Sequence, residues 1–196
     1  MADNAVTAPE QTPGPDDSAG IAVCVYCASR PVAQHYLDLA DEVGMGIAKR
    51  GWTLVSGGGR VSMMGEVARG ARRGGARTVG VMPRALVDLE VADTEADELL
   101  VVDNMRERKG LMDAHAQAFL ALPGGIGTCE ELFEVWTSRY IGMHDKPVVL
   151  LDPDDYYGGL LDWIEDMVRT GFATQRSVNA VTVVRDVESA LDACVP

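Results

Sequence analysis

The residues best suited to chemistry lie in a glycine-rich stretch, LPGGIGTCEE, at positions 122–131. The apolar run at 118–122 predicts a short buried strand that leads into the glycines. The apolar residues Leu132, Val135 and Trp136, at helical spacing, predict a helix that begins immediately after the glycines. Three glycines in four positions let the backbone approach a ligand closely, and the free N–H groups of a helix's first turn favour an anion. The stretch therefore predicts a phosphate-binding site.

The same residues also have a purely structural interpretation. In that interpretation, residues 124–127 form only a tight turn. Thr128 and Glu131 then match the S/T-x-x-E capping box, in which both side chains bond free N–H groups at the start of a helix. Taken alone, the stretch favours neither interpretation over the other.

Strands and helices alternate around this stretch. Apolar runs predict strands at 21–26, 52–55, 78–82, 99–102, 118–122, 146–151 and 180–184, with helical patterns between most of them. Strands that are apolar throughout are typical of a parallel sheet covered on both faces. We therefore expect a Rossmann-like, doubly wound α/β fold with three layers, α/β/α. A second glycine run, Ser56 to Gly59, follows the second strand, so both runs lie at strand carboxyl ends, where such folds bind ligands.

The length of 196 residues suits one domain. We place this nucleotide-binding domain at residues 21–196. Residues 1–20 contain prolines and acidic residues with almost no large apolar side chains, and we expect them to form a disordered tail.

Composition and charge exclude several classes of protein. The net charge of −13 argues against nucleic acid or an anionic membrane as a partner, and no apolar run reaches the ~20 residues of a membrane span. The N-terminus lacks the pattern of a secretory signal, so we expect a cytoplasmic location. Cys24 and Cys27 form C-x-x-C inside a predicted strand, where their thiols point to opposite faces, and we interpret them as buried structural thiols. The three histidines lack metal-ligand spacing, so no metal is predicted. We expect no cofactor either.

Familiar nucleotide motifs are absent from both glycine runs. Gly57-Gly58-Gly59 is followed by Ser62 where the dinucleotide fingerprint G-x-G-x-x-G has its third glycine, and neither run continues into the Lys-Ser or Lys-Thr of a Walker A loop. There is also no G-x-S-x-G nucleophile elbow. These absences argue against NAD binding, an ATPase and a serine hydrolase.

Cations gather at the start of the helix predicted at 105–115. Met105-Arg106-Glu107-Arg108-Lys109 opens this helix, and in a doubly wound sheet that end lies on the ligand side. Arginine offers a planar fork for phosphate or carboxylate, and lysine adds a point charge. Alternatively, the run is a solvated helix face, since four consecutive polar side chains cannot all point inward.

Two of these motifs together resemble a known family. Residues 123–131 match P-G-G-x-G-T-x-x-E, and residues 105–109 match M-x-x-R-K, the pattern of the LONELY GUY family of cytokinin-activating phosphoribohydrolases. The resemblance covers roughly residues 21–185, through Ser56–Gly59, GVMP at 80–83, Trp136, G-x-H-x-K-P at 142–147 and DYY at 155–157. Members are often labelled lysine decarboxylase-like, although nothing in this sequence identifies a lysine for pyridoxal phosphate.

The resemblance implies an activity and a set of residues. The family reaction hydrolyses the N-glycosidic bond of an N6-modified adenosine 5′-monophosphate and releases the free base and ribose 5-phosphate. By this resemblance Glu131 stabilises the developing oxocarbenium ion and Arg108 orients the nucleotide and stabilises charge, so these two are the expected catalytic residues. The expected substrate and phosphate contacts are Ser29, Gly58, Gly59, Glu90, Met105, Lys109, Gly124, Gly125, Gly127, Thr128 and Glu130.

Four positions depart from the family pattern. Ala28 and Arg30 stand where the first loop usually reads C-G-S-S, Ser62 replaces a glycine of the second loop, and Ile126 replaces a common tyrosine. These departures bear on substrate preference and leave the expected catalytic pair unchanged.

Two alternative functions remain open at this point. One is a carrier that binds a nucleotide or nucleotide cofactor without hydrolysis, and the other is a broader AMP-type nucleosidase. The resemblance also implies a homodimer. Met112, Phe119, Leu132 and Trp136 are available for an interface or for the core, and we expect them in the core.

Overall fold

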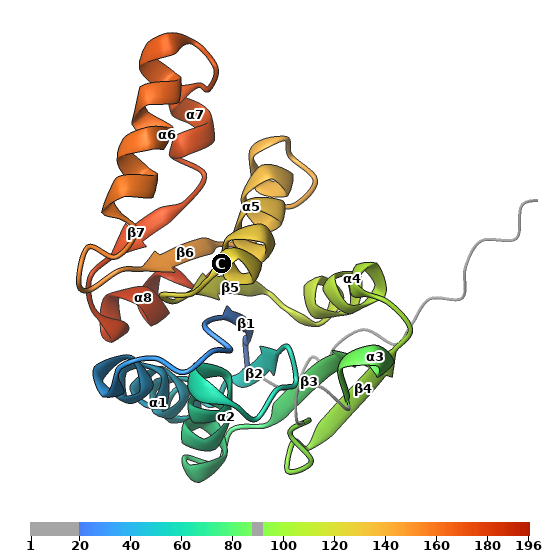
Figure 1. The fold of residues 1–196 in the computed structure, drawn as a ribbon. Helices are drawn as coiled ribbons and strands as arrows, with labels where there is room; N and C mark the ends of the chain where they lie inside the picture. Colours follow the sequence, from blue (N-terminus) through green and yellow to red (C-terminus); the bar gives the residue numbers. More distant parts are fainter. Residues whose placement is uncertain (1–19, 88–91) are drawn as a thin grey trace, which may run out of the picture.

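A single parallel sheet of seven strands organises the described part of the chain, in the order β4-β3-β2-β1-β5-β6-β7. The structure is a computed structural model and describes residues 20–87 and 92–196. The strands are β1 Ala22–Tyr26, β2 Thr53–Ser56, β3 Thr78–Pro83, β4 Glu98–Val102, β5 Ala118–Ala121, β6 Val148–Leu151 and β7 Thr182–Val184. Figure 1 shows the sheet running between two groups of helices.

The helices cover both faces of this sheet. They are α1 Gln34–Lys49, α2 Ser62–Arg73, α3 Arg84–Val87, α4 Met105–His115, α5 Ile126–Tyr140, α6 Gly158–Thr170, α7 Gln175–Val178 and α8 Val187–Ala193. Side chains of α1, α2 and α8 pack on one face, and side chains of α4, α5 and α6 pack on the other. The chain therefore has the three-layer, doubly wound α/β architecture that its sequence predicts.

Strand side chains alternate between the two layers, as the two-residue period of a strand requires. Val23 and Val25 lie in the layer of α1 and α2, whereas Cys24 and Tyr26 lie in the layer of α4 and α5. Cys27, just beyond β1, lies in the former layer, so the two thiols do face opposite sides. Both thiols are buried and free, which confirms their interpretation as structural.

Several boundaries differ from the sequence expectation. The helix predicted immediately after the glycines begins slightly earlier, at Ile126, because Gly127 and Thr128 are part of its first turn. The short helices α3 and α7 were not predicted, since four residues carry no readable period. The middle strand is β1, with β5 beside it. The predicted tail, apart from Gly20, lies outside the described residues.

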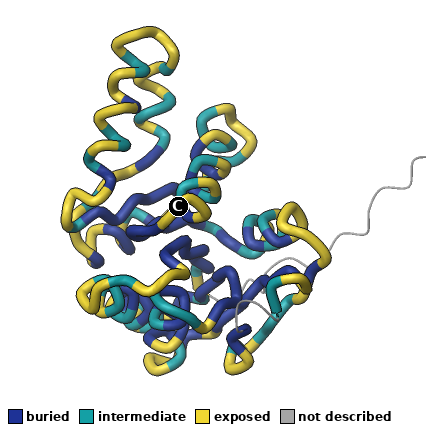
Figure 2. The backbone as a smooth tube through the Cα atoms, in the orientation of Figure 1, coloured by how far each residue is buried: buried dark blue, intermediate teal, exposed yellow. Residues whose placement is uncertain are grey.

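Burial follows the layers. The strands are mostly buried, while α6 has a single buried residue, Ile164, and runs along the outside of the molecule (Figure 2). The expected core residues Met112, Phe119, Leu132 and Trp136 are all buried, with Phe119 on a strand and the others on helices. The core thus includes the layer that holds α4 and α5 against the sheet.

Candidate active site

A cavity of about 640 Å³ opens at the carboxyl ends of the central strands. Strand order reverses between β1 and β5, and doubly wound sheets bind ligands in the crevice at such a switch point. The lining residues come from the loops after β1 and β5, from the starts of α1, α2, α4 and α5, and from α3 and the loop after β6. They are Cys27, Ala28, Ser29, Arg30, Val32, Tyr36, Met63, Met64, Leu86, Met105, Arg108, residues 123–128, Glu130, Glu131 and Tyr156.

The loop after β5 presents the start of α5 to this cavity. Gly125 is the residue before the helix, and no side chain caps it. A Cβ on Gly124 would collide with the Thr128 side chain, so glycine is required for Thr128 to fold back against the loop. The first-turn N–H groups and the helix dipole are therefore available to an anion in the cavity.

The capping-box interpretation of this loop is wrong. Thr128 and Glu131 would need to lie at the residue before the helix and at its third position. In the structure Gly125 precedes the helix, Thr128 already lies within the first turn, and Glu131 lies further along the helix. The Glu131 carboxylate instead faces Arg108, with Oε1 3.7 Å from Nη1.

Arg108 is fixed by its surroundings. Asn104 caps α4 by accepting hydrogen bonds from the N–H groups of Arg106 and Glu107, both at 3.0 Å. From the first turn of this helix the Arg108 side chain reaches under the cavity, where only 9% of it is exposed. Its Nε donates to the Val81 carbonyl at 3.1 Å and its Nη2 donates to the Gly57 carbonyl at 3.3 Å. The guanidinium is thus held by carbonyls of β3 and of the loop after β2, while the backbone of Arg108 belongs to the capped helix α4.

Glu131 lies in a poorly hydrated position. Its side chain is 12% exposed. Burial raises the pKa of Glu131 from 4.5 to about 7, and the nearby Arg108 guanidinium opposes part of this rise. A carboxyl group with a pKa near neutrality can hold or release a proton at physiological pH, which is a property of acid–base groups in active sites.

The loop after β2 serves a different purpose. Gly57, Gly58 and Gly59 are all buried, and none is among the described residues that line the cavity. A Cβ on Gly57 would collide with Nη2 of Arg108. Gly58 has φ +73° and packs so closely on β3 that a Cβ on Gly80 would lie 2.8 Å from its Cα. This glycine run therefore makes room for the Arg108 side chain and for β3.

The other expected contact residues divide between the cavity and its surroundings. Ser29, Met105 and Glu130 line the cavity, with Glu130 also paired to Lys109. Lys109 bridges α4 to α5, because its Nζ pairs with Glu130 and lies 2.7 Å from Glu134, and it is not among the described lining residues. Glu90 lies outside the described residues.

Comparison with known proteins identifies the family. A family model described as possible lysine decarboxylase matches residues 64–194. A cytokinin riboside 5′-monophosphate phosphoribohydrolase of Mycobacterium tuberculosis is 51% identical over 174 residues, covering 89% of this chain and 93% of the relative. The chain belongs to the cytokinin riboside 5′-monophosphate phosphoribohydrolase family. A second family member, from Mycobacterium marinum, is 48% identical over 92% of this chain and 97% of its own length.

Solved structures confirm the fold of this phosphoribohydrolase family member. A molybdenum cofactor binding protein from Rippkaea orientalis superposes with a TM-score of 0.69, covering 90% of this chain and 96% of its own. At 21% sequence identity this likeness concerns the fold alone. The resemblance that the two sequence motifs indicated is thus confirmed by the relatives, and the α/β architecture by the structural neighbour.

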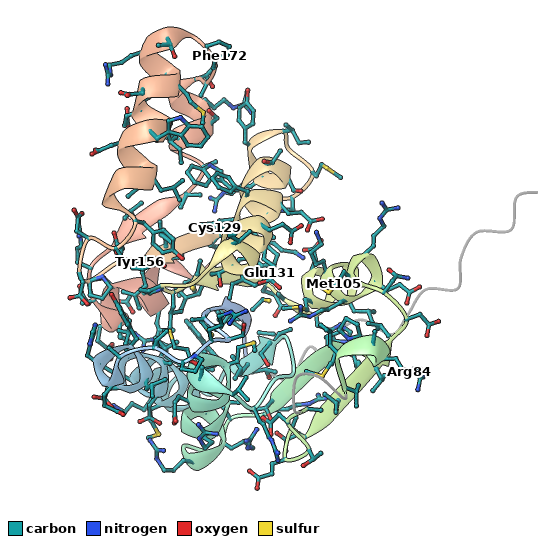
Figure 3. The ribbon with its side chains drawn as sticks, in the orientation of Figure 1. Arg84, Met105, Cys129, Glu131, Tyr156 and Phe172 are labelled. Atoms are coloured by element: carbon teal, nitrogen blue, oxygen red, sulfur yellow. The ribbon has the colours of Figure 1, made fainter. Side chains whose placement is uncertain are left out.

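The apolar walls of the cavity were not predicted. Met63 and Met64 form part of it from α2, Leu86 from α3, and Tyr36 and Tyr156 from α1 and the loop after β6. Figure 3 shows Tyr156 and Met105 on opposite sides of Glu131. Tyr156 is part of the family pattern but had no assigned role, and the two methionines have the spacing of ordinary core residues. The sequence therefore gave no signal that these three side chains line one cavity.

Tyr156 is fixed by the strand before it. The buried Asp152, at the end of β6, accepts hydrogen bonds from the N–H groups of Tyr156 at 2.7 Å and Tyr157 at 3.3 Å. The Tyr156 hydroxyl then donates to the Gly124 carbonyl at 2.9 Å, and the Tyr157 hydroxyl donates to the Leu122 carbonyl at 2.8 Å. The hydroxyls of the two tyrosines thus connect the loop after β6 to the glycine loop after β5 by hydrogen bonds.

Two kinds of feature are absent from the described residues. Within residues 20–87 and 92–196, no group of three or more His, Cys, Asp or Glu side chains could hold a metal ion. In the same described part of the chain, no helix has both the length and the apolar character needed to span a membrane.

Proposed function

We propose that this chain hydrolyses the N-glycosidic bond of N6-modified adenosine 5′-monophosphates, the cytokinin riboside monophosphates, to give the free base and ribose 5-phosphate. The observation that carries this proposal is the Arg108–Glu131 pair, 3.7 Å apart and nearly buried, in the same cavity as the free start of α5. A phosphate at that helix start would hold the ribose beside a carboxylate and a guanidinium. Family membership supports the same reaction.

The proposed reaction uses these groups in a simple order. The 5′-phosphate binds the backbone N–H groups of residues 125–128, and Thr128 offers its hydroxyl. As the bond between C1′ and the base nitrogen breaks, positive charge develops on the sugar, and the Glu131 carboxylate stabilises it. Water then forms the new bond to C1′ and gives its proton to Glu131, while the departing base keeps the bonding electron pair and accepts a proton from solvent.

The remaining contact residues complete the proposal. Arg108 orients the nucleotide, while Ser29, Met105, Glu130 and the glycines of the loop after β5 contact the substrate. Gly58, Gly59, Lys109 and Glu90 stay in the proposal as family-based assignments, and the first three act through the positions of Arg108 and α5. The methionines and Leu86 offer an apolar surface to an N6 substituent.

The test is release of base from N6-isopentenyladenosine 5′-monophosphate, measured beside AMP and the dephosphorylated riboside. We expect rapid cleavage of the modified monophosphate and little of the riboside, because only the former carries the phosphate. Equal cleavage of AMP would indicate a broader nucleosidase. Binding of the nucleotides without cleavage of any would contradict the proposal and favour a carrier.

We also propose a homodimer in the cytoplasm. Ile141, Met143 and Phe172 are large apolar residues with 59%, 74% and 89% of their surface exposed, which favours a protein contact surface. Light scattering of the purified chain measures its mass, and a monomer at micromolar concentration would contradict the dimer.

The cytoplasmic location is supported by the cysteines. The four free cysteines suit a reducing compartment.

A further inference from the structure

Two of the three nitrogens of the Arg108 guanidinium are held by backbone carbonyls. Nε donates to the Val81 carbonyl at 3.1 Å, and Nη2 donates to the Gly57 carbonyl at 3.3 Å. The third nitrogen, Nη1, lies 3.7 Å from Oε1 of Glu131 and 3.8 Å from the sulfur of Met105. A thioether sulfur is a weak acceptor. Nη1 therefore keeps hydrogen-bonding capacity for a substrate, and the Met105 sulfur lies against it.

The Met105 side chain is open to small solutes. It lines the cavity from the start of α4, and the residue is 43% exposed. Three other methionines near the site or in the core, Met63, Met64 and Met112, are buried. A cavity that admits a nucleotide also admits hydrogen peroxide, which is far smaller. Met105 thus combines exposure to an oxidant with direct contact to Arg108.

Oxidation changes the chemistry of this contact. A lone pair of the thioether sulfur attacks one oxygen of hydrogen peroxide, the O–O bond breaks, and the other oxygen leaves as water. The sulfur is oxidised by two electrons and the peroxide is reduced. The product is a polar sulfoxide whose oxygen is a strong hydrogen-bond acceptor. Because it is attached to an atom 3.8 Å from Nη1, this oxygen can accept a charge-assisted hydrogen bond from Arg108.

The cysteines are the other side chains that peroxide can oxidise. Cys24, Cys27 and Cys194 are buried, and Cys129 on α5 is partly exposed. Partial burial raises the pKa of the Cys129 thiol, which lowers the fraction of reactive thiolate at neutral pH. Oxidised cysteine and oxidised methionine also differ in their repair. Thiols reduce a sulfenic acid or a disulfide, whereas a sulfoxide requires methionine sulfoxide reductase, so one experiment can separate them.

We propose that Met105 is an oxidation site that controls this enzyme, because its sulfoxide occupies Nη1 of Arg108 and so removes that donor from a bound nucleotide. The inference rests on the proposed function for the role of Arg108 toward the nucleotide. The two residues are three positions apart on α4, so the modified side chain stays beside the guanidinium. Methionine sulfoxide reductase restores the thioether, which makes the control reversible.

The test treats the purified chain with hydrogen peroxide and follows sulfoxide formation at each methionine by mass spectrometry. Titration calorimetry with N6-isopentenyladenosine 5′-monophosphate measures the affinity before and after treatment. Wild type with oxidised Met105 should bind about tenfold or more weakly, since a charged hydrogen bond is lost. Methionine sulfoxide reductase should restore this affinity, and dithiothreitol alone should not.

Two leucine variants make a matched pair, and each is compared with its own untreated sample. Met105→Leu has no sulfur at the site, so peroxide should change its affinity by less than about twofold. Met143 is 74% exposed and is not among the described residues that line the cavity. Met143→Leu should therefore lose as much affinity on oxidation as wild type does.

Three results would overturn the proposal. Met105 could stay unmodified while Met143 is oxidised, or it could be oxidised with no loss of affinity. Equal losses in wild type and Met105→Leu would assign the effect to another residue, and recovery with dithiothreitol would point to Cys129. Because the readout is binding, a chain that binds the nucleotide and never releases base would contradict the proposed hydrolysis while this test still decides the oxidation site.

Discussion

The two glycine loops of this protein look alike in sequence and differ in structure. Each follows a parallel strand and precedes a helix, and each predicts a phosphate site. The loop after β5 opens into the cavity, and Cβ atoms on Gly125 and Gly127 would meet nothing within 4 Å. The loop after β2 is buried, and a Cβ on Gly57 would collide with Arg108. One loop leaves space for a ligand, and the other leaves space for a side chain.

This difference shows that a glycine run indicates close packing of another group against the backbone, but it does not identify that group. At the loop after β5 the approaching group comes from outside the chain in our proposal. At the loop after β2 it is the guanidinium of Arg108, whose Nη2 donates to the Gly57 carbonyl. The two loops therefore serve the same cavity, one directly and one through Arg108, and mutations can separate these roles.

The largest effect should come from Glu131→Gln on the helix after the open loop. The amide keeps the shape and loses the charge, so we expect kcat to fall by about 10²–10³-fold with little change in KM. Thermal stability should not fall, because Glu131 caps no helix end. Steady-state kinetics and a melting curve check both, and near-normal turnover would remove Glu131 from the catalytic pair.

The raised pKa of Glu131 makes both stability and activity depend on pH. Its folded pKa of about 7 exceeds its ordinary value of 4.5, so its contribution to stability is present below pH 4.5 and is lost as pH rises through 7. Relative to wild type, Glu131→Gln should gain up to about 3 kcal/mol in free energy of unfolding between pH 5 and pH 8. Urea unfolding at the two pH values measures this, and an equal difference at both would contradict it.

Activity should change with pH in the opposite direction. If the ionised carboxylate acts on the sugar, kcat/KM should fall by about tenfold per pH unit below the pKa of Glu131. The control is the pH profile of Arg176→Ser, which should match wild type. A profile that is flat from pH 5 to 8 would show that the protonation state of Glu131 does not matter.

A matched pair of glycine variants tests the comparison of the loops directly. Gly57→Ala should displace Arg108 and lower kcat by about 10–100-fold, because the cation at the reaction centre moves. Gly125→Ala adds a Cβ in open space, so folding should tolerate it, and its effect should appear as a higher KM for phosphorylated substrates. If Gly57→Ala raised KM alone, the two loops would have the same role after all.

The smallest effect should come from Tyr156→Phe. This change removes the hydroxyl that donates to the Gly124 carbonyl at 2.9 Å and keeps the ring. We expect a loss of about 0.5–1.5 kcal/mol in unfolding free energy and a rise in KM of a few-fold, since the open loop loses one support. Tyr157→Phe, which removes the bond to the Leu122 carbonyl, is the comparison variant. No change in either quantity would mean that the loop holds its shape without this contact.

The sequence predicted the sheet, the helix at 105–115 and the pairing of two distant motifs, because these depend on apolar runs and local spacing. It could not predict that Gly57 serves Arg108, since that contact joins residues 51 positions apart. Likewise, Met63, Met64 and Tyr156 meet in one cavity only after folding brings their elements together. The start of α5 was misplaced because glycines have poor helix propensity, and here the first turn includes Gly127.

The contacts of the Arg108 guanidinium also have an entropic consequence. An arginine that is immobilised only when a ligand arrives costs about 0.5–1.5 kcal/mol of binding free energy in lost rotamer freedom. Arg108 is already restrained by the Val81 and Gly57 carbonyls in the folded protein without a ligand. The free-energy cost of ordering the Arg108 side chain is therefore part of the free energy of folding, and it does not reduce the affinity of the cavity for a ligand.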